Sequence, residues 1–197
     1  MKRLFDFFVS FLGLIVLSPV ILAVSIAIKI EDGGSVFYRA RRTGLHGFSF
    51  IMYKFRSMVK DAEKIGPSST SSDDIRMTKT GIFLRKLKLD EIPQLLNVFI
   101  GNMSIVGPRP EVKKFTDMYT IEEHEILSFK PGITDWASIW NSNEGEILAG
   151  AADPDKAYLE LIRPEKIRLQ LKYVKNHNFL IDLKIIFLTL RKIIFGK

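Results

Sequence analysis

The chain has 197 residues, 47% of them apolar, and a mean hydropathy of +0.11, which suits one globular domain plus an apolar accessory segment. Its formal net charge of +7 predicts an anionic partner but does not choose among nucleic acid, anionic lipid and phosphorylated small molecules. The sequence contains no cysteine, which excludes disulfides, thiolate catalysis and cysteine-ligated metals.

The first predicted element is an uncharged apolar segment over residues 7–28. As one helix it would extend about 33 Å, enough to cross a bilayer. Ser18-Pro19 lies in its middle, and we expect the helix to break there because proline removes a backbone donor and clashes with the preceding turn. Basic residues flank the segment on both sides: Lys2, Arg3, Lys29, Arg39, Arg41 and Arg42. Positive flanks mark the cytoplasmic side, so a re-entrant helix and a kinked spanning helix both stay open.

Short strands are expected next, at residues 35–38 and 48–53, with a glycine-containing turn over 41–47 between them. Residues 57–65 are interpreted as a short helix. Residues 67–74 are rich in serine and threonine, which predicts a mobile polar loop.

A basic helix over residues 79–89 and an amphipathic helix after it are predicted from residue spacing. Apolar residues recur at the i, i+3, i+4 and i+7 positions of the second helix: Ile92, Leu95, Leu96 and Phe99. Gly101 is placed to end this helix, and Pro93 suits its first turn. Asp90 is therefore expected close to its N-cap.

The acidic pair Asp90 and Glu91 follows this basic helix, which is a suitable setting for phosphate groups. One carboxylate could attack phosphorus while the other handles protons, and Mg²⁺ could join a carboxylate to phosphate oxygens. The alternative is purely structural, with Asp90 as a helix cap and Glu91 as a partner of the helix dipole. Position alone leaves both interpretations open.

Arg109 lies between Pro108 and Pro110, which fix the backbone and leave the guanidinium little freedom. A rigid arginine suits a diphosphate, because its fork of donors matches phosphate oxygens. A structural turn that carries a surface arginine is the alternative.

The C-terminal stretch over residues 179–195 is apolar with spaced charges, which predicts an amphipathic helix in the headgroup region or, alternatively, an ordinary packing helix. No helix-turn-helix, zinc-finger or RNA-binding strand motif is present, so a nucleic-acid partner is not expected. The histidines show no ligand-like spacing, and no catalytic role is assigned to any of them: His46, His124 and His177.

Taken in order, these motifs resemble the bacterial sugar transferase family, small monotopic phosphoglycosyl transferases that start glycan assembly on a polyprenol carrier. The matching residues run along nearly the whole chain: Ser18-Pro19, Tyr53-Lys-Phe-Arg-Ser-Met58, Leu89-Asp-Glu-Ile-Pro-Gln94, Asn97, Gly101-Asn-Met-Ser104, Val106-Gly-Pro-Arg-Pro110 and Lys130-Pro-Gly-Ile-Thr134.

The resemblance implies an α/β fold, mostly helical with a small β-hairpin or sheet, in three parts. These are a re-entrant membrane helix over residues 1–30, a cytosolic catalytic domain over 31–178 and an amphipathic interfacial helix over 179–197. The expected location is the cytoplasmic face of the inner membrane, as a monotopic protein in contact with lipid. A homodimer is compatible with the sequence.

The implied activity moves a phosphosugar from a nucleoside diphosphate sugar, with uridine as the expected nucleoside, to undecaprenyl phosphate. This would be the first membrane step of exopolysaccharide, O-antigen or glycoprotein glycan synthesis. Asp90 would attack phosphorus and hold a covalent phosphosugar, with Mg²⁺ bound in part by Asp90, and Glu91 would handle the acceptor proton. The expected substrate-binding residues are Lys54, Arg56, Arg85, Pro108, Arg109 and Pro110.

One segment, residues 135–146, departs from the family pattern. Many relatives have glycine after the threonine and then a Gln-Val-Asn-Gly-Arg-type run, whereas this chain has Asp135 and lacks the arginine. We expect this segment to face the donor sugar. The competing hypotheses are a membrane-tethered basic module that binds lipid or nucleic acid without catalysis, and an inactive scaffold.

Overall fold

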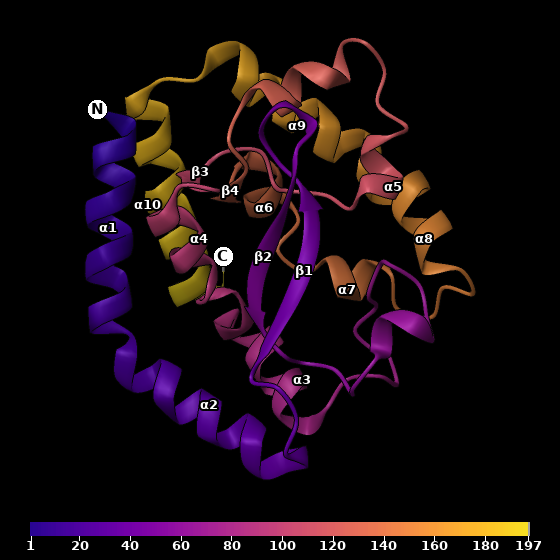
Figure 1. Ribbon diagram of the computed structural model, residues 1–197. Helices are drawn as coiled ribbons and strands as arrows, with labels where there is room; N and C mark the ends of the chain where they lie inside the picture. Colours follow the sequence, from indigo (N-terminus) through magenta and orange to yellow (C-terminus); the bar gives the residue numbers. More distant parts are fainter. Residues whose placement is uncertain (197) are drawn as a thin grey trace.

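The structure is a computed structural model that describes residues 1–196. Its N-terminal apolar segment forms two helices, α1 (Lys2–Val16) and α2 (Ser18–Asp32), which meet at Leu17 with a bend of 59° (Figure 1). Pro19 lies in the first turn of α2, where a missing N–H is tolerated, so the predicted break is confirmed. Taken singly, no described helix has the length and apolar character to cross a bilayer; only this bent pair together does.

The strands β1 (Phe37–Thr43) and β2 (Ser49–Phe55) form an antiparallel hairpin in which Phe37 lies opposite Phe55. The two expected strands are confirmed, but the turn expected over residues 41–47 begins too early. The first strand continues through Thr43, because its arginines pair across to the second strand, and only residues 44–48 form the turn.

The predicted helix over residues 57–65 is wrong. The segment contains one 3₁₀ turn at Ala62–Lys64, and Met58 instead forms an isolated β-bridge with Met77. A helix this short has too few hydrogen bonds to offset its nucleation, so tertiary pairing decides its conformation. Residues 67–74 form an irregular loop, as expected.

Two helices precede and follow the acidic pair: α3 (Lys79–Lys86) and α4 (Gln94–Ile100). Gly101, with φ of +96°, ends α4 as predicted. The Asn97 side chain joins α4 to the hairpin, because it donates to the Ile51 carbonyl at 2.7 Å and accepts the Tyr53 N–H at 2.9 Å. Fully buried Val98 packs there against Met52 and their neighbours, a contact of about 1.5–3 kcal/mol per side chain.

Two short strands, β3 (Ser104–Val106) and β4 (Gly132–Thr134), pair in parallel beyond α4. Gly107 and Gly132 make their close approach possible, since a Cβ on Gly132 would lie 2.1 Å from the Gly107 nitrogen. Because parallel strands end at the same edge, the residues that follow the two strands are brought together.

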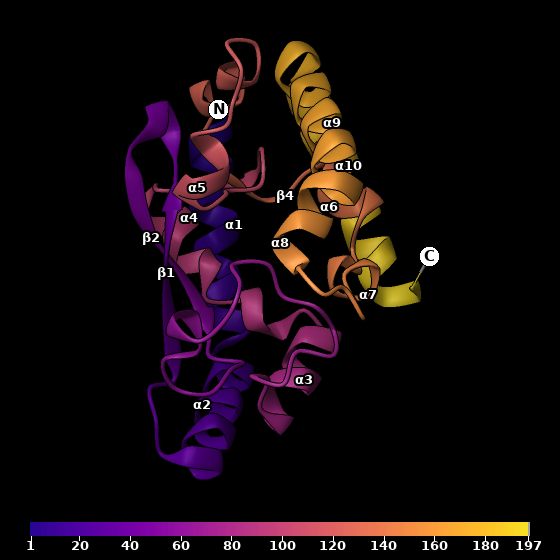
Figure 2. The same cartoon turned by 90° about the vertical axis from the view of Figure 1, so that its right-hand side faces the viewer.

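The rest of the chain is mainly helical. Its helices are α5 (Lys113–Thr116), α6 (Trp136–Trp140), α7 (Glu144–Ile147), α8 (Pro154–Ala157), α9 (Arg163–Asn176) and α10 (Phe179–Phe195), with a 3₁₀ helix at Glu123–Ser128 and a π-helical turn at Tyr158–Ile162. Figure 2 shows α9 and α10 on the opposite side of the molecule from the hairpin, with α1 and α4 between them. The predicted C-terminal helix is confirmed; Lys197, within the predicted segment, lies outside the described residues.

Both ends of the bent α1–α2 pair are attached to the rest of the chain. At the start of α1, Arg3 donates to two carbonyls at the end of α4, at 2.6 and 2.7 Å, and Asp6 accepts the Ile105 N–H at 3.0 Å. At the end of α2, Asp32 forms a bidentate ion pair with Arg56. The two ends therefore contact one and the same domain.

Candidate active site

The acidic pair lies in a 3₁₀ turn, Leu89–Glu91, between α3 and α4. Lys88 enters this turn with φ of +57°, which redirects the chain after α3. The N-cap of α4 is Pro93, and the Asp90 side chain accepts no capping hydrogen bond. Asp90 thus lies close to the N-cap, as expected, but it is not the cap, and the alternative that it serves as a helix cap does not explain why the residue is only 6% exposed.

Glu91 is the centre of a group of ion pairs. It accepts from Lys54 Nζ at 2.7 Å and from both terminal nitrogens of Arg109, one of them at 3.2 Å. Although burial raises the pKa of the Glu91 carboxyl, the charges of Arg109 and Lys54 outweigh it and hold this pKa well below its ordinary value. Glu91 is thus firmly ionised in the absence of substrate.

The Asp90 carboxylate has fewer partners than the Glu91 carboxylate. Its Oδ2 lies 3.7 Å from Lys54 Nζ, and within residues 1–196 no hydrogen bond to either oxygen is formed. Lys54 comes from β2 and therefore links the two acids across the open end of the hairpin. A carboxylate with lone pairs not engaged by donors is available to attack an electrophile.

Two further cations lie near the acids. Arg85, on α3, donates to Ser57 Oγ at 2.9 Å; burial lowers the pKa of its guanidinium, and the negative charge of Asp90 opposes this. The Lys88 ammonium donates a hydrogen bond to the Ser142 carbonyl. Desolvation lowers the pKa of Lys88, and the negative charge of nearby Glu91 opposes this shift. Lys88 was not among the predicted site residues, and its place in the basic run before the acids was the only signal.

These groups form a cationic site, with four basic side chains around two carboxylates: Lys54, Arg85, Lys88 and Arg109. The surplus of positive charge suits a ligand with two or more negative charges, as a diphosphate has. Arg109 is the residue with the best geometry for this, because its planar fork already binds one carboxylate in a bidentate manner. Pro108 and Pro110 enclose it, as the sequence predicts.

Arg56 lies apart from this site. Its Nε donates to the Ser35 carbonyl at 2.7 Å, and both terminal nitrogens bind Asp32. The Arg56 guanidinium lowers the pKa of Asp32 to about 2. The predicted substrate-binding role of Arg56 is not supported, because an acid at the end of α2 occupies the guanidinium.

Within residues 1–196, no three His, Asp or Glu side chains gather as a metal site. A dedicated protein cage for Mg²⁺ is not required, since this ion commonly binds one or two carboxylates together with substrate phosphates. Both oxygens of Glu91 are taken by cations, whereas Asp90 has free lone pairs. The donor set fits Mg²⁺ bound by Asp90 and a diphosphate.

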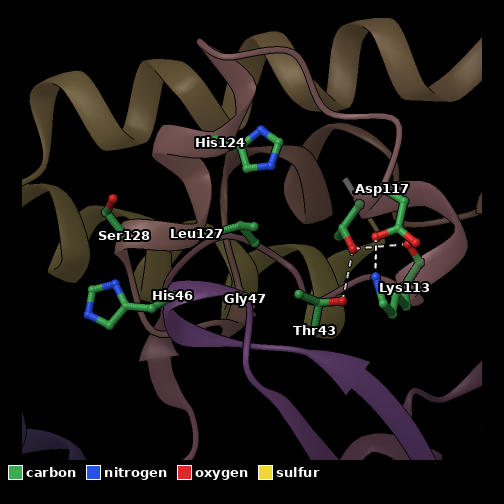
Figure 3. Close-up of a pocket in the computed structure, with 9 residues that line it drawn as sticks. Thr43, His46, Gly47, Lys113, Asp117, His124, Leu127 and Ser128 are labelled. Atoms are coloured by element: carbon green, nitrogen blue, oxygen red, sulfur yellow. Dashed lines mark hydrogen bonds and ion pairs between the residues drawn. The ribbon is translucent and has the colours of Figure 1, made fainter.

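A separate cavity of about 380 Å³ lies at the turn end of the hairpin (Figure 3). Its lining is largely polar: Thr43, His46, Gly47, Lys113, Thr116, Asp117, His124, Leu127 and Ser128. Lys113 and Asp117 pair with each other there. Because Lys54 is at the opposite end of the hairpin, this cavity is distinct from the cationic site.

Two residues of the segment over 135–146 hydrogen-bond to members of the cationic site: the Ser142 carbonyl accepts from Lys88, and Asp135 accepts from the backbone N–H of Arg109 at 3.1 Å. Asp135 is fully buried, and its carboxylate caps α6 by accepting from Ser138 N–H at 2.7 Å. Asp135 is therefore not exposed to a ligand, and the expectation that this segment faces the sugar now applies only to its later residues.

Comparison with known proteins gives a consistent result. The model of a family described as "Bacterial sugar transferase" matches residues 1–196. The chain is 38% identical to the uncharacterised sugar transferase EpsL of Bacillus subtilis, covering 98% of this chain and 87% of that protein. It is 37% identical to the UDP-glucose:undecaprenyl-phosphate glucose-1-phosphate transferase of Escherichia coli, covering 98% of this chain but 40% of that protein. It is 34% identical to the UDP-N-acetylgalactosamine-undecaprenyl-phosphate N-acetylgalactosaminephosphotransferase of Aeromonas hydrophila, covering 99% of this chain and 44% of that protein.

Proposed function

This chain belongs to the bacterial sugar transferase family, and we propose that it transfers a phosphosugar from a uridine diphosphate sugar to undecaprenyl phosphate. The observation that carries the proposal is the cationic site, in which a buried carboxylate without hydrogen bonds lies beside four basic side chains. Relatives that carry out this type of transfer are named for it, with either glucose or N-acetylgalactosamine as the sugar. The step would begin glycan synthesis at the membrane.

In the first step the donor's diphosphate binds Arg109, Lys88 and Arg85, which neutralise its charge. An Asp90 oxygen attacks the phosphorus that carries the sugar and forms an O–P bond. The bond from that phosphorus to the bridging oxygen breaks, and the nucleoside monophosphate leaves with the electron pair. Mg²⁺ held by Asp90 and the diphosphate would supply further charge neutralisation.

In the second step an oxygen of undecaprenyl phosphate attacks the same phosphorus and the Asp90 carboxylate leaves, so the enzyme is regenerated. Glu91 is too acidic to accept a proton while it pairs with Arg109 and Lys54. When the phosphate groups of the intermediate and of the acceptor bind these cations, the pKa of Glu91 rises toward its ordinary value, because its stabilising partners are shared. Glu91 could then take a proton from the acceptor phosphate.

The α1–α2 pair is proposed to enter one leaflet and return, as a re-entrant segment on the cytoplasmic face. Arg3 and Asp6 at one end, and Asp32 at the other, bind the same domain. A spanning helix would place its ends about 30 Å apart on opposite faces. Exposed apolar side chains suit lipid contact: Leu4, Phe8, Phe11, Leu12, Ile15, Val16, Leu22, Ile26 and Ile30, and on α10 Leu180, Phe187, Leu190, Ile193, Ile194 and Phe195.

The test is a panel of sugar nucleotides with Mg²⁺ and undecaprenyl phosphate, read by release of nucleoside monophosphate. Turnover with one donor is expected, and Asp90→Asn should abolish it while the protein stays folded and membrane-bound. Asp61→Asn is the matched control, since Asp61 is an exposed carboxylate in the left-handed conformation that asparagine tolerates. Normal turnover by Asp90→Asn would exclude this nucleophile, and binding of lipid without turnover of any donor would favour a non-catalytic module.

A further inference from the structure

The backbone of Arg109 has an N–H group that neither neighbouring residue can supply. Pro108 and Pro110 lack N–H groups, so the only backbone donor of this three-residue stretch is the N–H of Arg109 itself. The direction of the Arg109 side chain depends on how its N–H and C=O are held, because two fixed backbone groups determine where the Cα–Cβ bond points.

Two buried side chains hold both groups. The Arg109 N–H donates to Asp135 Oδ2 at 3.1 Å, and Gln170 Nε2 donates to the Arg109 carbonyl at 3.2 Å. Gln170 Nε2 also donates to Asp135 Oδ2 at 3.1 Å, which closes a ring of three hydrogen bonds. Neither side chain is exposed to solvent.

Asp135 is itself fixed by a second set of bonds. Its Oδ1 accepts from both the N–H and the Oγ of Ser138, each at 2.7 Å, at the start of α6. Asp135 directly follows β4, and the Arg109 stretch follows β3, so the parallel pairing of these strands brings the two together. Gln170 comes from α9, which packs on α6.

We propose that Asp135 and Gln170 are positioning residues that clamp the Arg109 backbone and so direct its guanidinium at Glu91 and at the donor's diphosphate. The proposal rests on the proposed function for its effect on turnover, but the clamp itself is independent of it.

Hydrogen exchange of a single amide tests the clamp without any activity. The full chain is prepared in nanodiscs with ¹⁵N-arginine, and exchange of the Arg109 N–H is followed by NMR. Asp135→Ser removes the acceptor for Arg109 but keeps a good helix cap for α6. We expect Arg109 exchange to accelerate about tenfold or more, as for loss of a buried hydrogen bond to a charged group. Asp153→Ser, the same substitution at the N-cap aspartate of α8, is the matched control and should leave Arg109 exchange unchanged.

Turnover then tests the positioning role. Asp135→Ser and Gln170→Leu should lower kcat about 10- to 100-fold, the effect of a misplaced group of about 1 Å, when turnover is measured below the Tm of each variant. In an Arg109→Ala background the same substitutions should have little further effect. Unchanged Arg109 exchange in Asp135→Ser overturns the clamp. An equal loss of kcat in both backgrounds overturns the positioning role. If wild type turns over no donor, the proposed function fails, and the exchange result still decides the clamp.

Discussion

Replacing Glu91 with glutamine changes few atoms, but it should disturb the cationic site strongly. The carboxylate has three charge-assisted contacts, to Lys54 and to the two terminal nitrogens of Arg109. Glutamine keeps the shape, but it has one acceptor oxygen and turns its NH₂ group toward a cation. Lys54 then has Asp90 as its remaining carboxylate, so we expect it to move closer and to hinder the nucleophile.

The size of the effect follows from burial. Removing one partner of a fully buried ion pair typically destabilises a protein by about 3–5 kcal/mol. Here the side chains of Lys54, Arg109 and Glu91 are 20%, 31% and 16% exposed, so water can partly replace the lost partner. We expect about 2 kcal/mol, which for a chain of this length corresponds to a decrease in Tm of about 4–8 °C.

The assay is thermal unfolding in detergent, followed by the fluorescence of Trp136 and Trp140, for wild type and Glu91→Gln. Because the pKa of Glu91 is lower in the folded chain than its ordinary value of 4.5, the ion pairs stabilise the protein fully above about pH 5. As the pH falls below 4.5 this contribution is lost, so the two Tm curves should converge in acid. Glu63→Gln, at an exposed acid, serves as the control. Equal Tm values for wild type and Glu91→Gln at pH 7 would refute the ion-pair description.

Three other outcomes are expected. Because the chain has no cysteine, a single cysteine can be labelled selectively in each of two variants, one with a cysteine inserted after Met1 and the other Ser35→Cys. In vesicles both cysteines should react from the cytoplasmic side only, and labelling from opposite sides would show a spanning helix. Asp6→Ala should destabilise the protein by about 1–3 kcal/mol in chemical denaturation, because it leaves the Ile105 N–H without its acceptor; an unchanged midpoint would contradict this contact. Because the pKa of Asp32 is about 2, its ion pair with Arg56 should be intact above pH 4 and should be lost as the pH falls through 2. Proteolysis near Gly33 should therefore accelerate only as the pH falls from 4 through 2.

The predictable parts of this fold are those governed by neighbouring residues. Pro19 breaks the first helix because of its own missing donor, and Gly101 ends α4 because only glycine adopts its φ of +96° easily. The segment over residues 57–65 was mispredicted, because Met58 pairs with Met77, which lies in a different loop. Local propensity does not contain that information.

In the candidate site, too, features set by local motifs could be predicted and those set by distant contacts could not. The acidic pair and Arg109 could be singled out from their motifs, and the structure brings them together. The partner of Arg56 and the clamp by Gln170 could not be predicted, since they depend on contacts between residues distant in the chain. Asp135 was interpreted by its position after a family motif, whereas its burial decides its role.

The proposed re-entrant arrangement of the bent helix pair, with both ends attached to one domain, would have a consequence for how the membrane acts on this protein. A spanning helix must match its apolar length to the thickness of the whole bilayer, and mismatch tilts it or deforms the lipid. A segment that enters and leaves by the same face meets only one leaflet, so acyl-chain length should affect it little. Lateral packing and anionic headgroups of that leaflet become the controlling variables, and they would set the depth at which the acidic pair meets a lipid phosphate.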